Sequence, residues 1–472
     1  MAFVFEDPGQ MQELNSKIPI DKISSLPDEL LINILNFLPT KYAVITSILS
    51  RRWCYLFKEV THLDFDDSLL FNNLCALNRE KSCVSFRDFV FKMLDCLKLP
   101  NLTSFRIKCT LRCECCVPES VRLWLSAIIS KGIQELDLCL GGAHVGFPPS
   151  LFTCKTLCIL KLTRGFTALN ILGTVCLPCL KILHLHQFIV VDYNLIKGIF
   201  SGCPLLQDFI MEPLIWYAAE ILPIFSAQSL RKLKLGDGKC LDFYDMERIY
   251  AVEIMAPLLQ SFHYADKLAK SYIFVPSNYL VEAHLEIFIE PGDFEDSTLS
   301  RSARDLIQGV SNAKRLFLSA DCIKALTMLK DELPILRNLT TLKIGCSTNP
   351  HFTLLRLLRT APNLEELIFS EGLFQVGFKD KDTVQQNYWG GRGRVVPPCL
   401  KTRLKVIEIE HFLGLKEELR IVEYFLSNGL VLEQLIIQKW VGRKGKFKIG
   451  KQLKRLAKRW NKTVNFNELF LF

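Results

Sequence analysis

The chain has 472 residues, of which 49% are hydrophobic and 23% are charged. This composition is typical of folded globular protein and excludes disordered, collagen-like and coiled-coil chains, while the length indicates several domains or a long repeat array. The net charge of +9 is concentrated at one end, because residues 439–472 hold eleven Lys and Arg and a single acid, and the remaining residues sum to −1. The composition therefore does not fit a protein that binds nucleic acid along its whole length.

The first twenty residues contain acids and no apolar run, so we expect a flexible tail over 1–20 and not a targeting peptide. The uncharged stretches 138–154 and 165–180 are short and are interrupted by Gly and Pro, so neither is expected to span a membrane. We expect a cytoplasmic and/or nuclear protein whose 18 cysteines are reduced thiols.

Residues 21–66 predict three short helices. Ser25 can cap a helix that begins near Pro27, with two acids in its first turn and apolar residues at spacings of three and four up to Leu38. Pro39 ends this helix, and two further short helices are expected before residue 66. Such a module has a marginal core by itself, so it must pack on a neighbouring domain or on a partner.

This segment resembles an F-box through the pattern LPDELL…ILxFLP…TSxLSxRW, which spans residues 26–53. The resemblance implies docking to a Skp-type adaptor and, through it, to a cullin–RING ubiquitin ligase. The candidate adaptor-facing residues are Leu26, Pro27, Leu30, Ile34, Leu35, Leu38 and Pro39. The alternative for each of these side chains is a place in the core of the module itself.

The segment between residues 99 and 440 repeats the signature L-x-x-L-x-L at steps in the twenties, which indicates a leucine-rich-repeat solenoid in which strands alternate with helices. Clear copies lie at 157–162, 180–185, 230–235, 339–344 and 364–369. Residues 266–312 break the rhythm, so irregular repeats or an insertion are expected there. We predict an α/β horseshoe with the solenoid proper over 67–376.

In each repeat strand the periodic leucines should face the interior, and the residues between them should face the concave sheet surface. That surface is the usual partner site of a solenoid, so it is the expected site for a protein target. The residues predicted to line it are Asp137, Lys161, His184, Lys234, His263, Phe317, Lys343 and Ile368.

After a polar, Gly-rich loop over 377–396, residues 397–472 resemble the FBD domain, which follows F-box and leucine-rich repeats in many plant proteins. The resemblance, carried by segments such as 396–400 and 404–407, implies a C-terminal α/β capping segment. Residues 449–460 predict an amphipathic helix with Lys and Arg on its outer face. Capping is favoured for this helix, and a nucleic-acid or membrane-surface contact is the alternative.

Two clusters suggest metal binding only weakly. Cys109, Cys113, Cys115 and Cys116 are crowded and lack a second pair at zinc-site spacing, and His184 and His186 have no further ligands nearby in the sequence. No catalytic set or cofactor motif is identified. We therefore expect a non-catalytic, cofactor-free substrate-recognition subunit of a ubiquitin ligase that binds an adaptor and an unknown protein target, and not nucleic acid. The alternative is a scaffold without a ligase.

Overall fold

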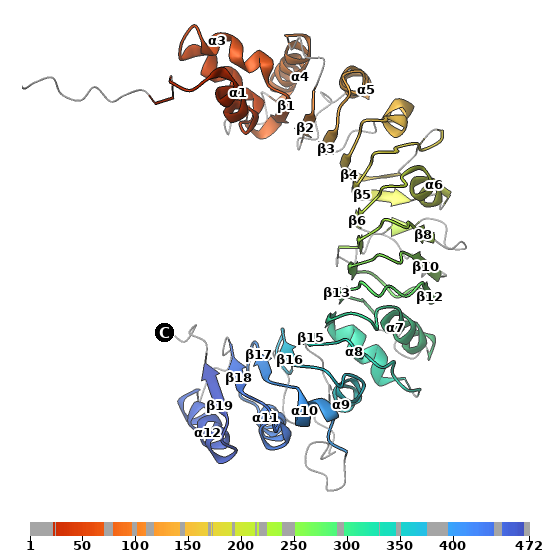
Figure 1. Cartoon of the computed structure of the whole chain (residues 1–472), viewed down its shortest axis with the longest axis vertical. Helices are drawn as coiled ribbons and strands as arrows, with labels where there is room; N and C mark the ends of the chain where they lie inside the picture. Colours follow the sequence, from red (N-terminus) through yellow and green to blue (C-terminus); the bar gives the residue numbers. More distant parts are fainter. Residues whose placement is uncertain are drawn as a thin grey trace, which may run out of the picture.

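The computed structural model of the chain is an arc of parallel strands whose two ends curve back toward each other (Figure 1). It describes residues 22–23, 25–69, 79–96, 102–109, 118–141, 147–168, 171, 173–190, 194–212, 215–216, 224–237, 251–289, 297–329, 331–345, 351–374, 395–438 and 446–466. Within these residues one 16-stranded sheet lines the inner side of the arc in chain order. The predicted α/β leucine-rich-repeat horseshoe is confirmed.

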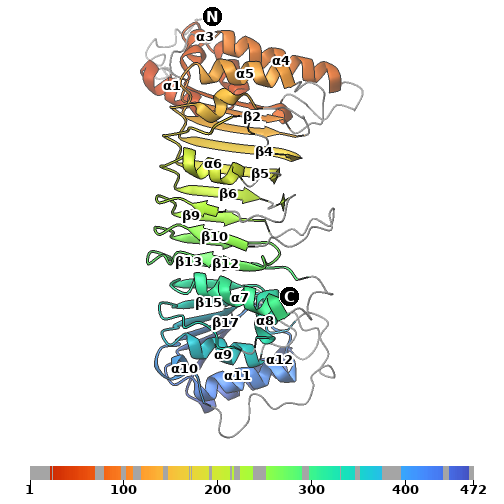
Figure 2. The ribbon, with the colours of Figure 1, turned by 90° about the vertical axis from the view of Figure 1, so that its right-hand side faces the viewer.

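The strands of this sheet are short, and every pair is parallel (Figure 2). In order across the sheet they are β1 (His62–Asp66), β2 (Ser104–Cys109), β3 (Glu135–Leu140), β4 (Ile159–Ala168), β5 (Ile182–Val190), β6 (Asp208–Glu212), β9 (Lys232–Leu235), β11 (Ser261–Tyr264), β13 (Glu282–Leu285), β14 (Arg315–Leu318), β15 (Thr341–Ile344), β16 (Glu366–Phe369), β17 (Val406–Ile409), β18 (Gln434–Ile437) and β19 (Thr463–Phe466), with β7 (Ile215–Trp216) beside β5.

Two rows of apolar side chains point from the sheet into the interior. The first row includes Leu136, Leu160 and Leu183, which lie opposite one another on neighbouring strands and are at most 3% exposed. The second row lies two residues further along each strand, because alternate residues of a strand share a face. Each repeat therefore buries its leucines against the next repeat, and no repeat could form this core alone.

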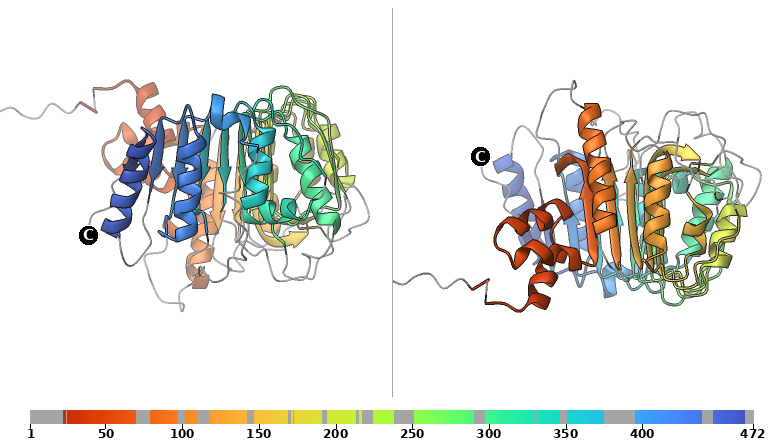
Figure 3. Two further views of the ribbon diagram at one scale, coloured as in Figure 1. Left: turned by 90° about the horizontal axis from the view of Figure 1, so that it is seen from below. Right: turned by 90° about the horizontal axis from the view of Figure 1, so that it is seen from above.

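Helices cover the outer side of the arc (Figure 3), and a second small sheet covers this side near its middle (Figure 1). The helices outside the N-terminal module are α4 (Arg79–Cys96), α5 (Pro118–Ile129), α6 (Asn194–Gly202), α7 (Ser297–Gly309), α8 (Ala320–Thr327), α9 (His351–Thr360), α10 (Pro398–Thr402), α11 (Lys416–Asn428) and α12 (Lys446–Arg459). The small sheet consists of β8 (Ile224–Ser226), β10 (Ala251–Met255) and β12 (Ser271–Phe274).

The irregular segment over 266–312 contains one regular repeat strand that the leucine signature does not mark. Strand β13 carries Ala283 where most other repeats carry Leu, yet Ala283 pairs in register with Phe262 and Leu316 and is buried. Among the other described residues of the segment, β12 and α7 pack against each other on the outer side. The segment is therefore a short repeat followed by a long one.

The N-terminal module consists of α1 (Asp28–Asn36), α2 (Thr40–Ile45) and α3 (Trp53–Leu56), and it is joined to the sheet by hydrogen bonds. The side-chain oxygen of Asn36 accepts from the backbone N–H groups of Thr61 (2.9 Å) and His62 (3.2 Å), and the hydroxyl of Thr40 accepts from the N–H of Asp64 (2.8 Å). The strand at the end of the module, β1, is the first strand of the sheet. The module therefore caps the N-terminal edge of the solenoid.

The C-terminal segment continues the same sheet through β17, β18 and β19, so it is part of the solenoid's architecture. The carboxylate of Glu418, in the first turn of α11, is fully buried and accepts backbone N–H bonds from Leu413, Gly414 and Leu415. Two of these amides lie in the turn before the helix and the third belongs to its N-cap residue, Leu415, so the carboxylate ties this turn to the start of the helix. The loop predicted over 377–396 lies almost wholly outside the described residues.

Candidate protein-interaction surfaces

Helix α1 presents one row of apolar side chains to solvent. Leu30 (47% exposed), Ile34 (44%) and Phe37 (88%) recur at i, i+4 and i+7, which places them on one face of the helix. A second exposed row, Ile45, Ile48 and Leu49, follows in the next turns. A soluble monomer seldom exposes so many large apolar side chains in one small module, and such surfaces mark protein contacts. We call these six residues the apolar docking patch.

Leu35 does not belong to this patch. It is 1% exposed and packs with Leu31 in the core that joins the module to the solenoid, so its side chain is not available to an adaptor in this structure. For Leu35 the structure supports the alternative, a place in the core, because the buried stripe of α1 runs through Leu31 and Leu35.

Among the other candidates, Pro27 is exposed, Pro39 is half-buried, and Leu26 and Leu38 are partly buried against the core. The contact of any of them with an adaptor stays a prediction.

The eight residues predicted for the concave surface lie in one row across the sheet. Register pairs Asp137 with Lys161, Lys161 with His184, and so on across the arc. The complete row is Asp64, Arg106, Asp137, Lys161, His184, Ile210, Lys234, His263, His284, Phe317, Lys343, Ile368, Glu408, Ile436 and Asn465. Binding of a target to this row stays a prediction.

At the N-terminal end of the row, charges of opposite sign alternate. The Arg106 guanidinium lies 3.1 Å from the carboxylate of Asp64 and 3.6 Å from that of Asp137. Burial raises the pKa of Asp137, although Arg106 and Lys161 act in the opposite direction. This part of the concave surface is a ladder of ion pairs and carries little excess charge.

In the middle of the row, carboxylates face imidazoles and amines. His184 Nε2 lies 3.4 Å from Asp208, and His186 Nδ1 lies 3.4 Å from Glu212, which also pairs with Lys234. Burial alone would raise the pKa of Glu212, but the hydrogen bonds with His186 and Lys234 outweigh it and lower the pKa to about 2. The basic residues predicted here are therefore largely matched by acids from neighbouring positions.

Three rings form a stack at the centre of the concave row. The ring centroids of His263 and His284 are 4.2 Å apart at an interplanar angle of 15°, and those of His284 and Phe317 are 4.0 Å apart at 22°. Burial lowers the pKa of both histidines to about 4, and Lys234 contributes in each case. Both imidazoles are therefore neutral near pH 7, and the stack is an uncharged aromatic surface between Lys234 and Lys343.

The sequence missed His284, the central ring of this stack, because its strand does not carry the leucine signature. The signal was present in the alternation of apolar and polar residues around Ala283 and Leu285, which marks a strand with His284 on the opposite face. Arg106 and Ile210 of the same row were also missed. Their strands carry Phe105 and Phe209 at the periodic position, as the strand of His263 carries Phe262, so weaker copies of the signature could have marked them.

The basic end of the chain lies on helix α12. Leu453 and Ala457 are buried, while Lys451, Lys454, Arg455, Lys458 and Arg459 are exposed. The helix therefore has the one apolar and one polar face that a terminal cap needs. Of the cysteine cluster, Cys109 is buried at the end of β2, and the other three cysteines lie outside the described residues.

Comparisons with known proteins agree with this architecture. The F-box domain family model matches residues 23–63, and the family model described as At1g61320/AtMIF1, LRR domain, matches residues 98–462, which covers residues 397–462 of the segment that resembles an FBD domain. Across the described parts of the chain, no helix has the length and apolar character needed to cross a bilayer.

Three similar proteins come from Arabidopsis thaliana. F-box/LRR-repeat protein At4g14103 is 32% identical over 361 residues, which cover 74% of this chain and 91% of that protein. Putative F-box/LRR-repeat protein At5g41840 is 32% identical over 83% of this chain and 78% of its own length, and F-box/LRR-repeat protein At4g14096 is 31% identical over 88% and 87%. The chain therefore belongs to the F-box/LRR-repeat protein family.

Proposed function

We propose that the chain is the substrate-recognition subunit of an SCF-type (Skp–cullin–F-box) ubiquitin ligase. The observation that carries the proposal is the apolar docking patch, which is exposed on a module whose other face is built into the solenoid. An adaptor that covers the patch would bury several large apolar side chains at about 25 cal/mol per Å² of apolar surface.

In this proposal the concave row binds the target protein. The central ring stack offers a flat, uncharged surface, and the flanking ion-pair ladders offer matched charges that select a complementary partner. The chain contributes no acid–base chemistry to the transfer of ubiquitin. It raises the effective concentration of a target lysine near the ligase, and its action in the cytosol or nucleus is part of the same proposal.

The joint between the module and the sheet supports this mechanism. Because β1 belongs both to the end of the F-box match and to the sheet, a target on the concave row would stand at a defined distance from the adaptor. A flexible linker would instead spread the target over many positions and lower its effective concentration.

The test is binding of the purified full chain to a Skp-type adaptor. The double variant Leu30→Asp/Ile34→Asp should lower the affinity at least 100-fold, because it places two charges in an apolar interface. Leu205→Asp is the matched control, since Leu205 is also 47% exposed but lies on the solenoid. Unchanged affinity in a folded double variant would refute the docking assignment.

A second function is favoured by one observation, the exposed Lys and Arg residues of α12. In this alternative the outer face of α12 binds nucleic acid or an anionic membrane surface. Binding to RNA, DNA or anionic vesicles at low salt, lost as salt is raised, would support it. No binding at low salt would remove it.

A further inference from the structure

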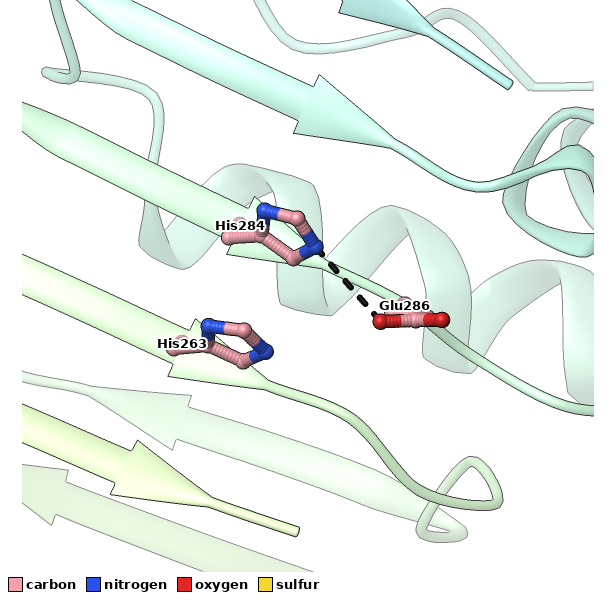
Figure 4. Close-up of side chains that lie close together, drawn as sticks. All are labelled: His263, His284 and Glu286. Atoms are coloured by element: carbon pink, nitrogen blue, oxygen red, sulfur yellow. Dashed lines mark ion pairs between the residues drawn. The ribbon is translucent and has the colours of Figure 1, made fainter. Parts of the chain in front are cut away.

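Three potential metal ligands meet on the concave surface, at the first two rings of the ring stack. Residues His263 and His284 are directly opposite each other on the neighbouring parallel strands β11 and β13. Glu286 follows His284 by two residues and therefore points to the same face (Figure 4). One donor atom from each of the three lies within 4.8 Å of the other two, and His284 Nε2 is already 3.6 Å from a carboxylate oxygen of Glu286.

We propose that His263, His284 and Glu286 bind a divalent transition-metal ion of the Zn²⁺ class. Two imidazole nitrogens and one carboxylate oxygen are a ligand set that suits Zn²⁺, Ni²⁺, Cu²⁺ and Co²⁺, whereas Mg²⁺ and Ca²⁺ prefer oxygen ligands alone. The proposal does not depend on adaptor docking or on the assignment of a protein target.

The distances require only local movement of side chains. Ligands about 2.0–2.1 Å from a tetrahedral metal lie about 3.4 Å from one another, somewhat closer than the spacing found here. The nearly parallel rings of His263 and His284 cannot both direct a lone pair at one ion, so one ring must rotate. His284 stacks on both His263 and Phe317, whereas His263 stacks only on His284 within this group of three rings. His263 is therefore the ring that can rotate with the smaller loss of contacts.

Charged side chains of both signs surround the three ligands. The carboxylates of Glu371 and Asp237 lie close enough to Glu286 to act on it electrostatically, as does the ammonium of Lys234. Lys234 and Lys343 oppose a cation, but Lys234 pairs with Glu212 and Lys343 lies 4.0 Å from Glu410.

The three ligands lie on an open surface, with His284 38% and Glu286 40% exposed at the side chain. A metal with three protein ligands keeps at least one position for a further donor, which here faces the concave space.

The experiment is titration of the purified, chelator-treated full chain with Co²⁺, whose spectrum distinguishes nitrogen and oxygen ligands from thiolates. This distinction matters because the chain contains 18 cysteines. We expect d–d bands without the intense thiolate charge-transfer band, one equivalent bound, competition by Zn²⁺, and no competition by Mg²⁺.

The variants His263→Ala, His284→Ala and Glu286→Gln should each weaken Co²⁺ affinity at least tenfold. His184→Ala and His186→Ala are matched controls, because these histidines lie on the same concave surface and pair with acids in the same way. Circular dichroism and thermal melting confirm that each variant is folded, and Glu286→Gln retains the shape of the site. Equal affinity in ligand and control variants, a thiolate spectrum, or no binding would each overturn the proposal.

Discussion

Leu30 and Leu35 are both leucines in neighbouring turns of α1, but the structure predicts that truncation of Leu35 lowers stability whereas truncation of Leu30 weakens adaptor binding. Leu35 is 1% exposed, and replacement of a fully buried Leu by Ala costs about 3 kcal/mol. Leu30 is 47% exposed, so the same replacement should cost less than about 1 kcal/mol in stability. In an adaptor interface, Leu30→Ala should instead cost about 1–2 kcal/mol of binding energy.

Hydrogen exchange of the α1 amides measures the loss of stability at α1 itself. A local measurement is necessary because a repeat protein of this length need not unfold in one step. Leu35→Ala should speed exchange about 100-fold, since 1.4 kcal/mol corresponds to a factor of ten, while Leu30→Ala should leave exchange within about fivefold of the wild type. Titration with the adaptor measures the second effect, and Leu30→Ala should weaken binding about 10-fold. Equal exchange in both variants, or full adaptor affinity in folded Leu30→Ala, would refute the assignment of inner and outer faces.

Three further predictions concern the solenoid. Glu418→Ala should destabilise the start of α11 by about 3 kcal/mol, because three amides lose a charged acceptor, and faster hydrogen exchange confined to that helix would confirm it. Burial raises the pKa of Asp266 to about 7 in the folded chain, against an ordinary value of 3.8. Folding therefore favours the protonated carboxyl group, and the stability of the chain falls as the pH rises from 3.8 to about 7. Asp266→Asn should therefore be more resistant to urea than the wild type at pH 8 and equal to it at pH 4; a wild type that is the more stable at pH 8 would contradict this. In the folded chain the pKa of His263 and His284 is lowered to about 4 from 6.5. As the pH falls, the two imidazoles are therefore protonated in the unfolded chain before they are protonated in the folded chain, and stability falls between pH 6.5 and 4. A His263→Asn/His284→Asn variant should lose less stability over that window, and an unchanged urea profile would argue against the lowered values.

The concave row was predictable because the leucine signature fixes the strand register directly. Once the periodic leucines point inward, the residue between them must point outward, and parallel pairing aligns these residues across the arc. This is why eight predicted residues lie in a single row, from Asp137 to Ile368. The same logic failed for His284, because Ala283 fills the inward position without matching the signature.

Other features could not be predicted from local patterns. The apolar stripe of α1 is wide enough to serve two faces, and only the packing of the module on the solenoid decides that Leu31 and Leu35 are inside. The strands β8, β10 and β12 replace outer helices in the middle of the arc, and their short runs carry no leucine period. The sequence suggests that the C-terminal segment is a separate unit, because a long polar stretch precedes it. In the structure β17 pairs in register with β16 and continues the same sheet.

The central claim is that one chain connects a target on the concave row to a ligase through the apolar docking patch. Affinity purification of the tagged full chain from plant cells with the proteasome inhibited, followed by quantitative mass spectrometry, tests this claim directly. The wild type should recover a Skp-type adaptor, a cullin and ubiquitinated proteins, and Leu30→Asp/Ile34→Asp should lose the adaptor and cullin while it keeps proteins bound to the concave row. A wild-type chain that recovers no adaptor or cullin under these conditions would contradict the account.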